Sequence, residues 1–503
     1  MKTSKKIILV NLLFTIISCQ NENQTDIAPI DTSVNFKHKV TLNIGNEGAS
    51  EITAFDKTSK KLFTVNVESN EISINNISNL TNPVKETPIN LNAYGAPNSV
   101  AVFDKKLAIA VENNTKQNPG KVLVFSTINN TLLNTYTVGA LPDMITFSPD
   151  GKTIVCANEG EPNNDYTIDP KGSVSIINLE NNNVTTLDFT SFNPQENTLK
   201  NKGFRVFGPN ADLAKDVEPE YVAISEDSKT AWVSLQENNG IAKVNLDSKT
   251  IDAIYPLGFK DYSLAENSID ASDKDDKKEL KTWPVKGMYQ PDAIVYVKIN
   301  GIEYIISANE GDARDYDGFS EEIRMDDLTL DETIFPDNKD FLNEINLGRL
   351  KTTNTLGDAN NDGKVEALFS YGARSFSIWS ANGSLVYDSG NSIATETLAF
   401  TLDRFNDNDK RSDDKGAEPE SVEILNIGNE RYILFVGLER NDQVLLYDIT
   451  NPNAPQFLQI LSHSGDEAPE GLLIIPAKDS PSNKDLLVVS NEDSGTVTIY
   501  ENN

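Results

Sequence analysis

A unit of one acidic turn, one short apolar strand and a second strand that ends in an acidic residue returns seven times along this sequence. The clearest turns are Glu218-Pro219-Glu220, Glu418-Pro419-Glu420 and Pro469-Glu470-Gly471, and the second strands include TIVCANE, YIISANE and DLLVVSNE. Repeats of roughly 40–50 residues that contain short strands and no helical period are typical of β-propellers. The repeat therefore predicts an all-β propeller in which the acidic residues of successive units lie near one central channel.

Counting four strands per unit predicts seven blades. The last unit shows only GLLIIPA, DLLVVSNE and TVTIYEN, whereas an extra strand, KVTLNIG at 39–45, precedes the first unit. We expect this N-terminal strand to complete the last blade, because a ring closed in this way has no open edge. Residues 36–503 would then form one domain. An eight-bladed count would need a whole blade within residues 360–390, where only its outer half is visible.

Four insertions interrupt blades three to five, at residues 160–172, 194–217, 259–290 and 311–367. Insertions in repeat arrays tend to lie on one face, often the binding face. The charged stretch SIDASDKDDKK at residues 268–278 is either a solvated loop or a cover for the channel mouth.

The N-terminus reads as an export signal. Lys2, Lys5 and Lys6 precede an apolar stretch too short to span a bilayer, which ends Ile16-Ile17-Ser18-Cys19. This ending resembles the bacterial lipobox, in which the cysteine is acylated, for example with palmitate. We expect residues 1–18 to be a lipoprotein signal peptide, residues 19–35 a tether, and Cys19 the lipid anchor of an outer-membrane lipoprotein that faces the periplasm or the cell surface. The alternative is an ordinary signal peptide cut elsewhere.

The net charge and the cysteine content bear on which ligands and which covalent links this protein can have. The formal net charge of −32 disfavours nucleic-acid binding, which needs a basic face, and attracts divalent cations. The second cysteine, Cys156, has no intramolecular partner for a disulfide and is expected to be a buried core residue. We expect a monomer that has no nucleic-acid partner.

The most specific short motif is DANNDGKVE at residues 358–366. Its oxygen donors would be Asp358, Asn360, Asp362, the Lys364 carbonyl and Glu366. This set suits a hard cation, and Gly363 permits the sharp turn. Phe369 stands where an EF-hand has its bidentate Glu, so the motif instead resembles the calcium loops of integrin-type propellers and dockerins. We expect calcium to pin the blade-five insertion; the alternative is a plain Asn-Asp-Gly turn.

A second constellation is acidic throughout. Asn158-Glu159-Gly160-Glu161 recurs as Asn309-Glu310-Gly311-Asp312, and each copy precedes an Asp-Tyr pair. Glu439 and Glu492 occupy the same register in the last two units. The acids expected to face them at the starts of first strands are Asp143, Glu220, Asp292, Glu420 and Glu470. Arg314 is the one cation in the motif.

These acids allow two interpretations. They could cap strands and turns within each blade, or they could form a central ring that holds cations, with Glu220, Glu420, Glu470 and Glu492 as ligands. Clustered carboxylates without a cation would raise one another's pKa values. Histidine chemistry finds no support, because His38 and His463 belong to no triad or zinc pattern. No phosphate-cradling glycine loop is present.

Several blocks, among them LPDMITFSPDGKTIVCANEGEP, DVEPEYVAISED, SANEGDARDYDGF and APEGLLII, resemble the bacterial choice-of-anchor I domain, which also makes up animal mesenchyme-specific cell-surface glycoproteins. The resemblance covers residues 36–503 and implies an extracytoplasmic propeller without a settled activity. Some members are labelled alkaline phosphatase, and the Pro-Glu-Gly and Asn-Glu patterns are distantly similar to phytase-like propellers, which hold phosphate through calcium-bound carboxylates. The cysteine and lysine-rich sites of propeller phosphatases have no clear counterpart here.

Two functions remain open. The first is a surface-anchored, calcium-binding recognition or scaffold module for an unknown surface ligand or anionic small molecule. The alternative is a metal-dependent phosphoesterase of the alkaline phosphatase or phytase-like type, which needs two or more divalent cations and no His or Ser. Its candidate catalytic residues are Glu159, Glu161, Glu310, Asp312 and Arg314, with Arg314 as the phosphate clamp.

Overall fold

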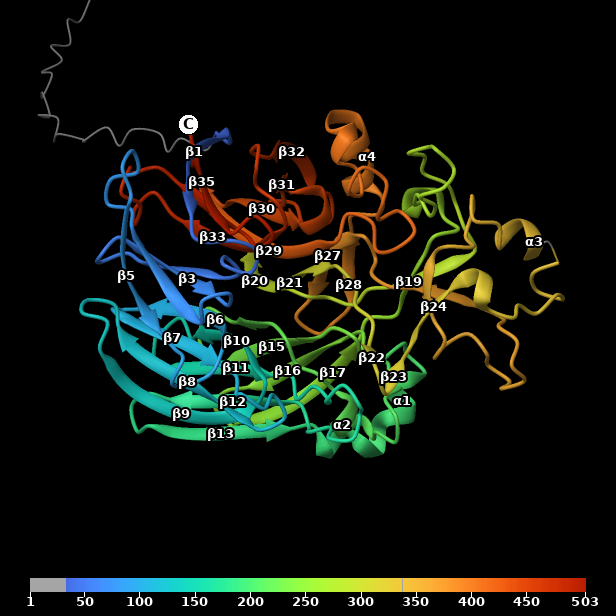
Figure 1. Ribbon diagram of the computed structural model, residues 1–503, viewed down its shortest axis with the longest axis horizontal. Coiled ribbons are helices and arrows are strands. Elements are labelled where there is room, and N and C mark those ends of the chain that lie inside the picture. Colours follow the sequence, from blue (N-terminus) through green and yellow to red (C-terminus); the bar gives the residue numbers. More distant parts are fainter. Residues whose placement is uncertain (1–32, 337) are drawn as a thin grey trace, which may run out of the picture.

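The computed structural model describes residues 33–336 and 338–503 (Figure 1), so the predicted signal peptide, Cys19 and most of the predicted tether lie outside the described residues. Within the described residues, seven antiparallel sheets have four strands each. The strands are rich in β-branched and aromatic residues, which fit a pleated, half-buried surface.

Four sheets are built from consecutive strands of the N-terminal half. The first contains β2 (Thr53–Asp56), β3 (Lys61–Asn66), β4 (Glu71–Asn76) and β5 (Val84–Asn90). The second contains β6 (Pro97–Phe103), β7 (Lys106–Val111), β8 (Pro119–Ser126) and β9 (Leu132–Ala140). The third contains β10 (Pro142–Phe147), β11 (Thr153–Asn158), β12 (Ser173–Asn178) and β13 (Asn183–Asp188). The fourth contains β14 (Val222–Ile224), β15 (Thr230–Leu235), β16 (Gly240–Asn245) and β17 (Thr250–Pro256).

The remaining three sheets differ in how the chain enters them. The fifth contains β20 (Ile294–Ile299), β21 (Ile302–Asn309), β27 (Ser375–Ser380) and β28 (Leu385–Asp388), with an insertion between β21 and β27. The sixth contains β29 (Pro419–Gly428), β30 (Arg431–Leu438), β31 (Gln443–Asp448) and β32 (Gln456–Leu461). The seventh contains β33 (Pro469–Ile475), β34 (Leu486–Asn491), β35 (Thr496–Asn502) and, from the other end of the chain, β1 (Phe36–Asn43).

Strand β1 pairs antiparallel with β35 at the outer edge of the seventh sheet. Phe36 is 1% exposed, and its ring meets that of Phe435 in the sixth sheet edge-on at 5.2 Å between centroids. His38 and His463, which the sequence leaves unconnected, stack with their ring centroids 3.7 Å apart. The N-terminal strand thus joins the last two sheets of the chain.

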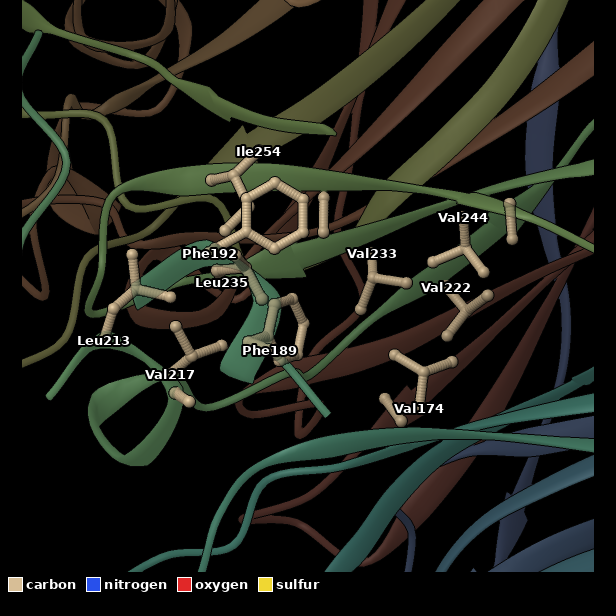
Figure 2. Packing of buried hydrophobic residues seen from close by; sticks show 14 of the residues in the cluster. Val174, Phe189, Phe192, Leu213, Val217, Val222, Val233, Leu235, Val244 and Ile254 are labelled. Carbon is tan, nitrogen blue, oxygen red and sulfur yellow. The ribbon is translucent and has the colours of Figure 1, made fainter. Parts of the chain in front are cut away.

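The first strand of each sheet contacts the first strand of the next. These contacts follow chain order from β2 through β6, β10, β14, β20 and β29 to β33, and β33 also contacts β2. Neighbouring sheets bury their faces against each other. Figure 2 shows the cluster between the third and fourth sheets, where Val174 lies opposite Val222 and Val233, and Phe189 fills the end of the layer. Cys156 is fully buried in the cluster between the second and third sheets, as predicted.

Two insertions combine into an additional sheet that the sequence did not reveal. Its strands are β18 (Phe259–Asp261), β19 (Val285–Met288), β26 (Leu368–Ser370), β25 (Lys351–Thr353) and β24 (Glu322–Arg324), with β19 and β26 parallel. A hairpin of β22 (Asp315–Tyr316) and β23 (Phe319–Ser320) precedes β24. The additional sheet projects to one side of the molecule in Figure 1. Strands this short, paired across more than one insertion, leave no periodic signal in the sequence.

Short helices occupy several connections of this all-β fold. They are α1 (Glu196–Lys200), α2 (Leu213–Asp216), α3 (Asn338–Phe341) and α4 (Ser392–Phe400), with 3-10 turns η1 (Thr190–Gln195), η2 (Ala265–Asn267), η3 (Met325–Asp327), η4 (Leu402–Arg404) and η5 (Glu439–Asn441). None of the helices in residues 33–336 and 338–503 has the length and apolar character needed to cross a membrane.

The charged stretch 268–278 begins with buried residues, and its remaining residues are exposed or half-buried. Its first residues pack beside the additional sheet, where Ile269 and Ala271 share a buried cluster with Met325 and Leu347. Burying the apolar residues Ile269 and Ala271 is favourable, and this holds the start of the stretch against the additional sheet.

Removing β1 tests how much this strand contributes to stability. A protein that lacks residues 20–43 should lose its cooperative unfolding transition or at least about 3 kcal/mol of unfolding free energy, because Phe36 and Leu42 leave buried sites. Denaturant titration of a matched protein that lacks only residues 20–32 gives the comparison. Equal stability of the two proteins would show that β1 is dispensable.

Candidate functional site

One register position at the start of each first strand carries an acidic residue in six sheets and an amide in the other. These residues are Glu51, Asn98, Asp143, Glu220, Asp292, Glu420 and Glu470. All seven line two adjoining cavities of about 280 and 340 Å³, which share five acidic residues. We call these joined cavities the acid cup. Ile52, Met144 and Tyr221 are among the other residues that line it.

Local backbone features aim these side chains into the cup. The register of the strand pairs shifts at Pro97/Ser99, Pro142/Ile145, Pro419/Val422 and Pro469/Gly471, so the residue after each proline sits in a bulge. Bulges re-aim side chains and occur next to functional sites. Five acids of the first ring follow a proline, and the residues before four of these prolines, Leu141, Gln290, Glu418 and Ala468, have positive φ values between 42° and 56°. Side chains rarely tolerate this conformation, so the turn geometry is held by its surroundings.

In five of the seven sheets, the residue that follows the second strand supplies a second ring. Glu112, Glu159, Gln236, Glu310 and Glu439 hold this place and line the acid cup. Backbone hydrogen bonds fix them next to the first ring: Glu159 N–H donates to Leu141 C=O at 2.9 Å, and Glu439 N–H donates to Glu418 C=O at 2.9 Å. Of the predicted residues, Glu161 and Asp312 also line the cup, whereas Glu492 does not.

Three carboxylates from two neighbouring sheets converge most closely. One oxygen of each of Asp292, Glu310 and Glu420 lies within 4.8 Å of the others, and Glu310 forms a second such group with Glu418 and Glu439. Oxygen donors of this kind suit a hard divalent cation. The sequence-based prediction placed Glu310 and Glu420 together, but it did not identify Glu418.

The electrostatics of the acid cup are unfavourable when all carboxyls are ionised. Burial, followed by repulsion from neighbouring acids, raises the pKa of Glu51 to about 8 and the pKa of Asp143 to about 7. The same two causes hold the pKa values of Glu220, Glu420 and Glu470 well above the usual range of glutamic acid. Near neutral pH the cup therefore takes up protons or cations.

Lys116 and Arg440 are the basic residues that line the cup, and Lys415 lies behind it, paired with the lining residue Glu310; the sequence did not reveal any of the three. The Lys415 ammonium group forms an ion pair with Glu310 and lies 3.5 Å from Glu418 and 3.9 Å from Asp312. Arg440 lies 2.8 Å from Glu439 at the same side. Lys415 belongs to the connection between η4 and β29, outside the repeated motif, whereas Arg440 directly follows Glu439.

Arg314 does not have the free guanidinium group that a phosphate clamp requires. It is 2% exposed, and its nitrogens lie 2.9 Å from Asp216 and 3.0 Å from Glu218. The guanidinium also stacks over Phe207 at 4.6 Å. The prediction that Arg314 is the cation of the site, free to hold phosphate, is therefore wrong. Arg314 instead links its own insertion to α2, through Asp216, and to the turn before Glu220, through Glu218.

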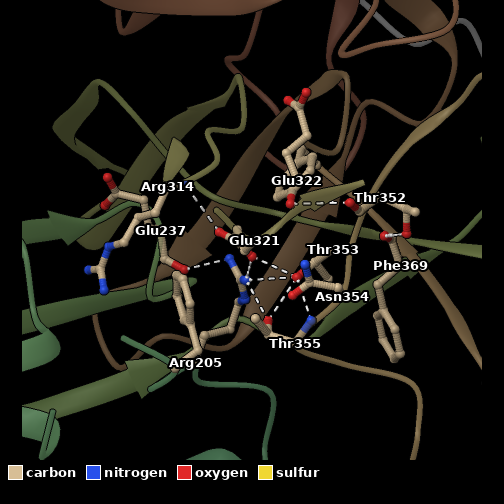
Figure 3. Close-up of polar contacts among 12 residues, drawn as sticks. Arg205, Glu237, Arg314, Glu321, Glu322, Thr352, Thr353, Asn354, Thr355 and Phe369 are labelled. Carbon is tan, nitrogen blue, oxygen red and sulfur yellow. Dashed lines mark hydrogen bonds and ion pairs between the residues drawn. The ribbon is translucent and has the colours of Figure 1, made fainter. Parts of the chain in front are cut away.

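Figure 3 shows a second buried arginine beside it. Arg205 donates to Glu237 C=O at 2.9 Å and forms an ion pair with Glu321, which also accepts from Arg314 N–H at 3.2 Å. Thr353 in β25 donates to Glu321 at 2.6 Å. Buried charges without partners are costly, so each of these groups is held by others. The network fixes the additional sheet to the turns of the fourth sheet.

The loop 358–366 connects β25 to β26 and has the geometry of an oxygen-rich turn. Carboxylate oxygens of Asp358, Asp362 and Glu366 lie within 4.8 Å of one another. Gly363 N–H donates to Asp358 at 2.9 Å, and Gly363 has a φ of +83°, which glycine adopts without strain. The residues present fit a calcium ion, since the donors converge and remain at the surface.

Comparisons with known proteins agree with this architecture. A family model described as "Choice-of-anchor I domain" matches residues 51–452. Gigasin-3a of Magallana gigas is 32% identical over 184 residues, which cover 31% of this chain and 64% of gigasin-3a, so the match spans just under two thirds of that protein.

Two solved structures are similar to this chain over most of its length. Kuenenia stuttgartiensis hydrazine synthase has a TM-score of 0.50 at 12% identity, covering 91% of this chain and 96% of that one. The β-propeller domain of Myceliophteria thermophila Cps50 (Swd1) has a TM-score of 0.47 at 8% identity, covering 93% and 100%. At these identities a likeness concerns the fold alone.

The raised pKa values predict how stability depends on pH. Because folding raises the pKa of Glu51 and Asp143 above the unfolded value of roughly 4, the folded state binds more protons than the unfolded state between these values. In the presence of chelator, the unfolding free energy should therefore fall as pH rises from 6 to 8.

Glu420→Gln, which removes one charge at nearly constant shape, should raise the unfolding free energy at pH 8. A Glu180→Gln variant, altered at an exposed acid far from the cup, should leave the pH profile unchanged. A flat wild-type profile would contradict the electrostatic argument.

Proposed function

Because the chain belongs to the choice-of-anchor I domain family, we propose that it is a recognition or scaffold module of the cell envelope, attached to the membrane through Cys19. The observation that carries the proposal is the acid cup, in which every sheet contributes a polar residue from the same position. Such a site forms only when all seven sheets are assembled, because each sheet supplies one of its lining residues. The proposal places the protein outside the cytoplasm, as a monomer that binds no nucleic acid.

The proposed architecture is a closed ring of seven blades. Supporting it are the seven four-stranded sheets, the contacts between successive first strands, and the contact between β33 and β2. The pairing of β1 with β35 supports closure by the N-terminal strand. Such closure removes free strand edges between the first and last blades.

The proposed ligands of the cup are divalent cations, and through them an anionic small molecule. Asp292, Glu310 and Glu420 would hold a first cation. Negative charge lines the cup, so an anion would be repelled until a cation is present. Lys415 and Arg440, which pair with Glu310 and Glu439, would add two positive charges once these two acids turn toward the metal.

The proposed calcium site at residues 358–366 is separate from the cup and structural in role. A calcium ion bound by Asp358, Asn360, Asp362, the Lys364 carbonyl and Glu366 would hold the connection between β25 and β26. Calcium binding would stabilise the additional sheet in particular, since the loop connects two neighbouring strands of that sheet.

Calcium titration tests this assignment. Calcium added to the chelator-stripped protein should raise the melting temperature, with a stabilisation of about 3–4 kcal/mol when free calcium exceeds its dissociation constant several hundred-fold. Asp362→Ala should remove one calorimetric binding event, whereas Asp317→Ala, at an exposed acid outside the loop, should retain it. Unchanged calcium binding in Asp362→Ala would refute the loop site.

A metal-dependent phosphoesterase is the second candidate, favoured by the convergence of Asp292, Glu310 and Glu420. Two cations in the cup could polarise a phosphoryl oxygen and supply a bound hydroxide. The acids available for them include Glu159, Glu161, Glu220, Asp312 and Glu470. Since Arg314 is held by Asp216 and Glu218, the phosphate would be met by Lys415 instead.

Hydrolysis assays separate the two candidates. A phosphomonoester and a phosphodiester are supplied with calcium, manganese or iron. An enzyme should lose activity by at least about 100-fold in Glu310→Gln, because a metal ligand is lost, and keep it in Asp362→Ala. Absence of turnover with a folded, metal-loaded protein would leave the recognition module as the remaining function.

A further inference from the structure

An exposed apolar patch lies where α4 meets the outer strand of the sixth sheet. Phe400, the last residue of α4, is 67% exposed, and Leu402 is 51% exposed. The Phe400 ring stacks on Phe457 of β32 with 5.8 Å between centroids. A groove of about 360 Å³ runs between them, along Leu458 and Ile460. We call these residues the α4–β32 patch.

The patch adjoins the point at which the N-terminal strand enters the fold. The side chain of Gln459, in the groove wall, accepts from Phe36 N–H at 3.1 Å and donates to Phe36 C=O at 2.8 Å. Val34 and Leu458 pack against the same buried cluster. Figure 1 shows β1, β32 and α4 along one edge of the molecule. The chain that leads back to Cys19 therefore starts beside the patch.

The distance to the proposed lipid anchor is short. Cys19 precedes Phe36 by 17 residues, and an extended chain spans at most about 3.5 Å per residue, or roughly 60 Å in all. A tether of this length gives any surface near its base a high effective concentration at the bilayer, on the millimolar scale. A contact too weak to hold a free protein would then be occupied most of the time.

The charges at the edge of the patch are compatible with a lipid surface. Although the whole chain has a net charge of −32, the ammonium group of Lys278 donates to Leu402 C=O at 2.8 Å, and Lys37 of β1 is exposed on the same edge. Asp403 is the exposed acid between Leu402 and Arg404. Exposed aromatic and aliphatic side chains with cations beside them are typical of surfaces that rest in the headgroup layer of a membrane.

We propose that the α4–β32 patch rests on the bilayer to which Cys19 attaches the protein, with Phe400, Leu402 and Phe457 inserted at the interface. This inference rests on the proposed lipid anchoring. The strands β1 and β32 are the outermost strands of their sheets, whereas the acid cup is built from the first strands at the opposite edge of each sheet. Contact through the outer edge keeps the mouth of the cup open to solvent.

Tryptophan quenching tests the contact in the acylated full chain on phosphatidylethanolamine vesicles, with and without anionic phosphatidylglycerol. A Phe400→Trp variant should be quenched at least about threefold more strongly by lipids brominated near the headgroup than Ile128→Trp. Ile128 is a matched control, because it is 53% exposed and belongs to the turn between β8 and β9. The signal of the wild-type protein is subtracted from both.

Each outcome bears on a separate claim. Protein that floats with the vesicles but shows equal quenching in both variants would overturn the contact and leave the anchoring intact. Protein that does not float would overturn the anchoring and this inference with it. A dimer in sedimentation that becomes a monomer in Phe400→Ser would show that a second copy covers the patch, and would also overturn the contact. Phe400→Ser on vesicles should increase hydrogen exchange of α4 and β32.

Discussion

Each four-stranded sheet has two apolar faces, and both must be covered by neighbouring sheets; the rest of the structure depends on this constraint. The second strands show it most clearly, because β34 is buried in all six of its residues and β11 in five of six. A sheet with two apolar faces cannot be stable alone, and its faces are covered only when neighbouring sheets stack side by side. The clusters of buried residues between successive sheets are the result. Strand β1 matters for the same reason, since Phe36 packs against the sixth sheet while β1 pairs within the seventh.

Convergence of the first strands has an electrostatic consequence. Stacking brings the same register position of every sheet to one place, so a residue type repeated at that position becomes a local charge cluster. Mutual repulsion in a partly desolvated cup opposes folding, as the raised pKa values of Glu51, Glu220 and Glu470 show. Lys415 and Arg440 offset part of this repulsion on one side only. In the cavity that Glu51 and Asp143 line, Lys116 is the basic residue, and its ammonium group lies 3.8 Å from Glu112.

The repeated unit in the sequence predicted most acids of the cup, but not the residues and strands that the insertions and connections place around it. Glu220, Glu420 and Glu470 could be placed together from sequence because a proline precedes each acid at the same point of the repeat. Glu51 and Asn98 were missed, since one lacks the proline and the other lacks the charge. Lys415 was missed because a connection without repeats positions it, and the additional sheet was missed because its strands have only three or four residues. Arg314 was found by its motif, but its partner Asp216 lies 98 residues earlier, and no local pattern reports such a contact.

Two hydrogen bonds, one ion pair and short stretches of backbone connect the loop 358–366 with the acid cup. The loop follows β25, in which Thr353 donates to Glu321 at 2.6 Å. Glu321 accepts from Arg314 N–H at 3.2 Å, and the Arg314 side chain lies 3.0 Å from Glu218. Glu218 precedes Pro219-Glu220, the point where the fourth sheet contributes to the cup. Each link is buried, so a change at one link leaves a charged group without its partner, at a cost of several kcal/mol. An ion that fixes β25 and β26 would therefore also restrict the position of Glu220, even though no residue of the loop lines the cup.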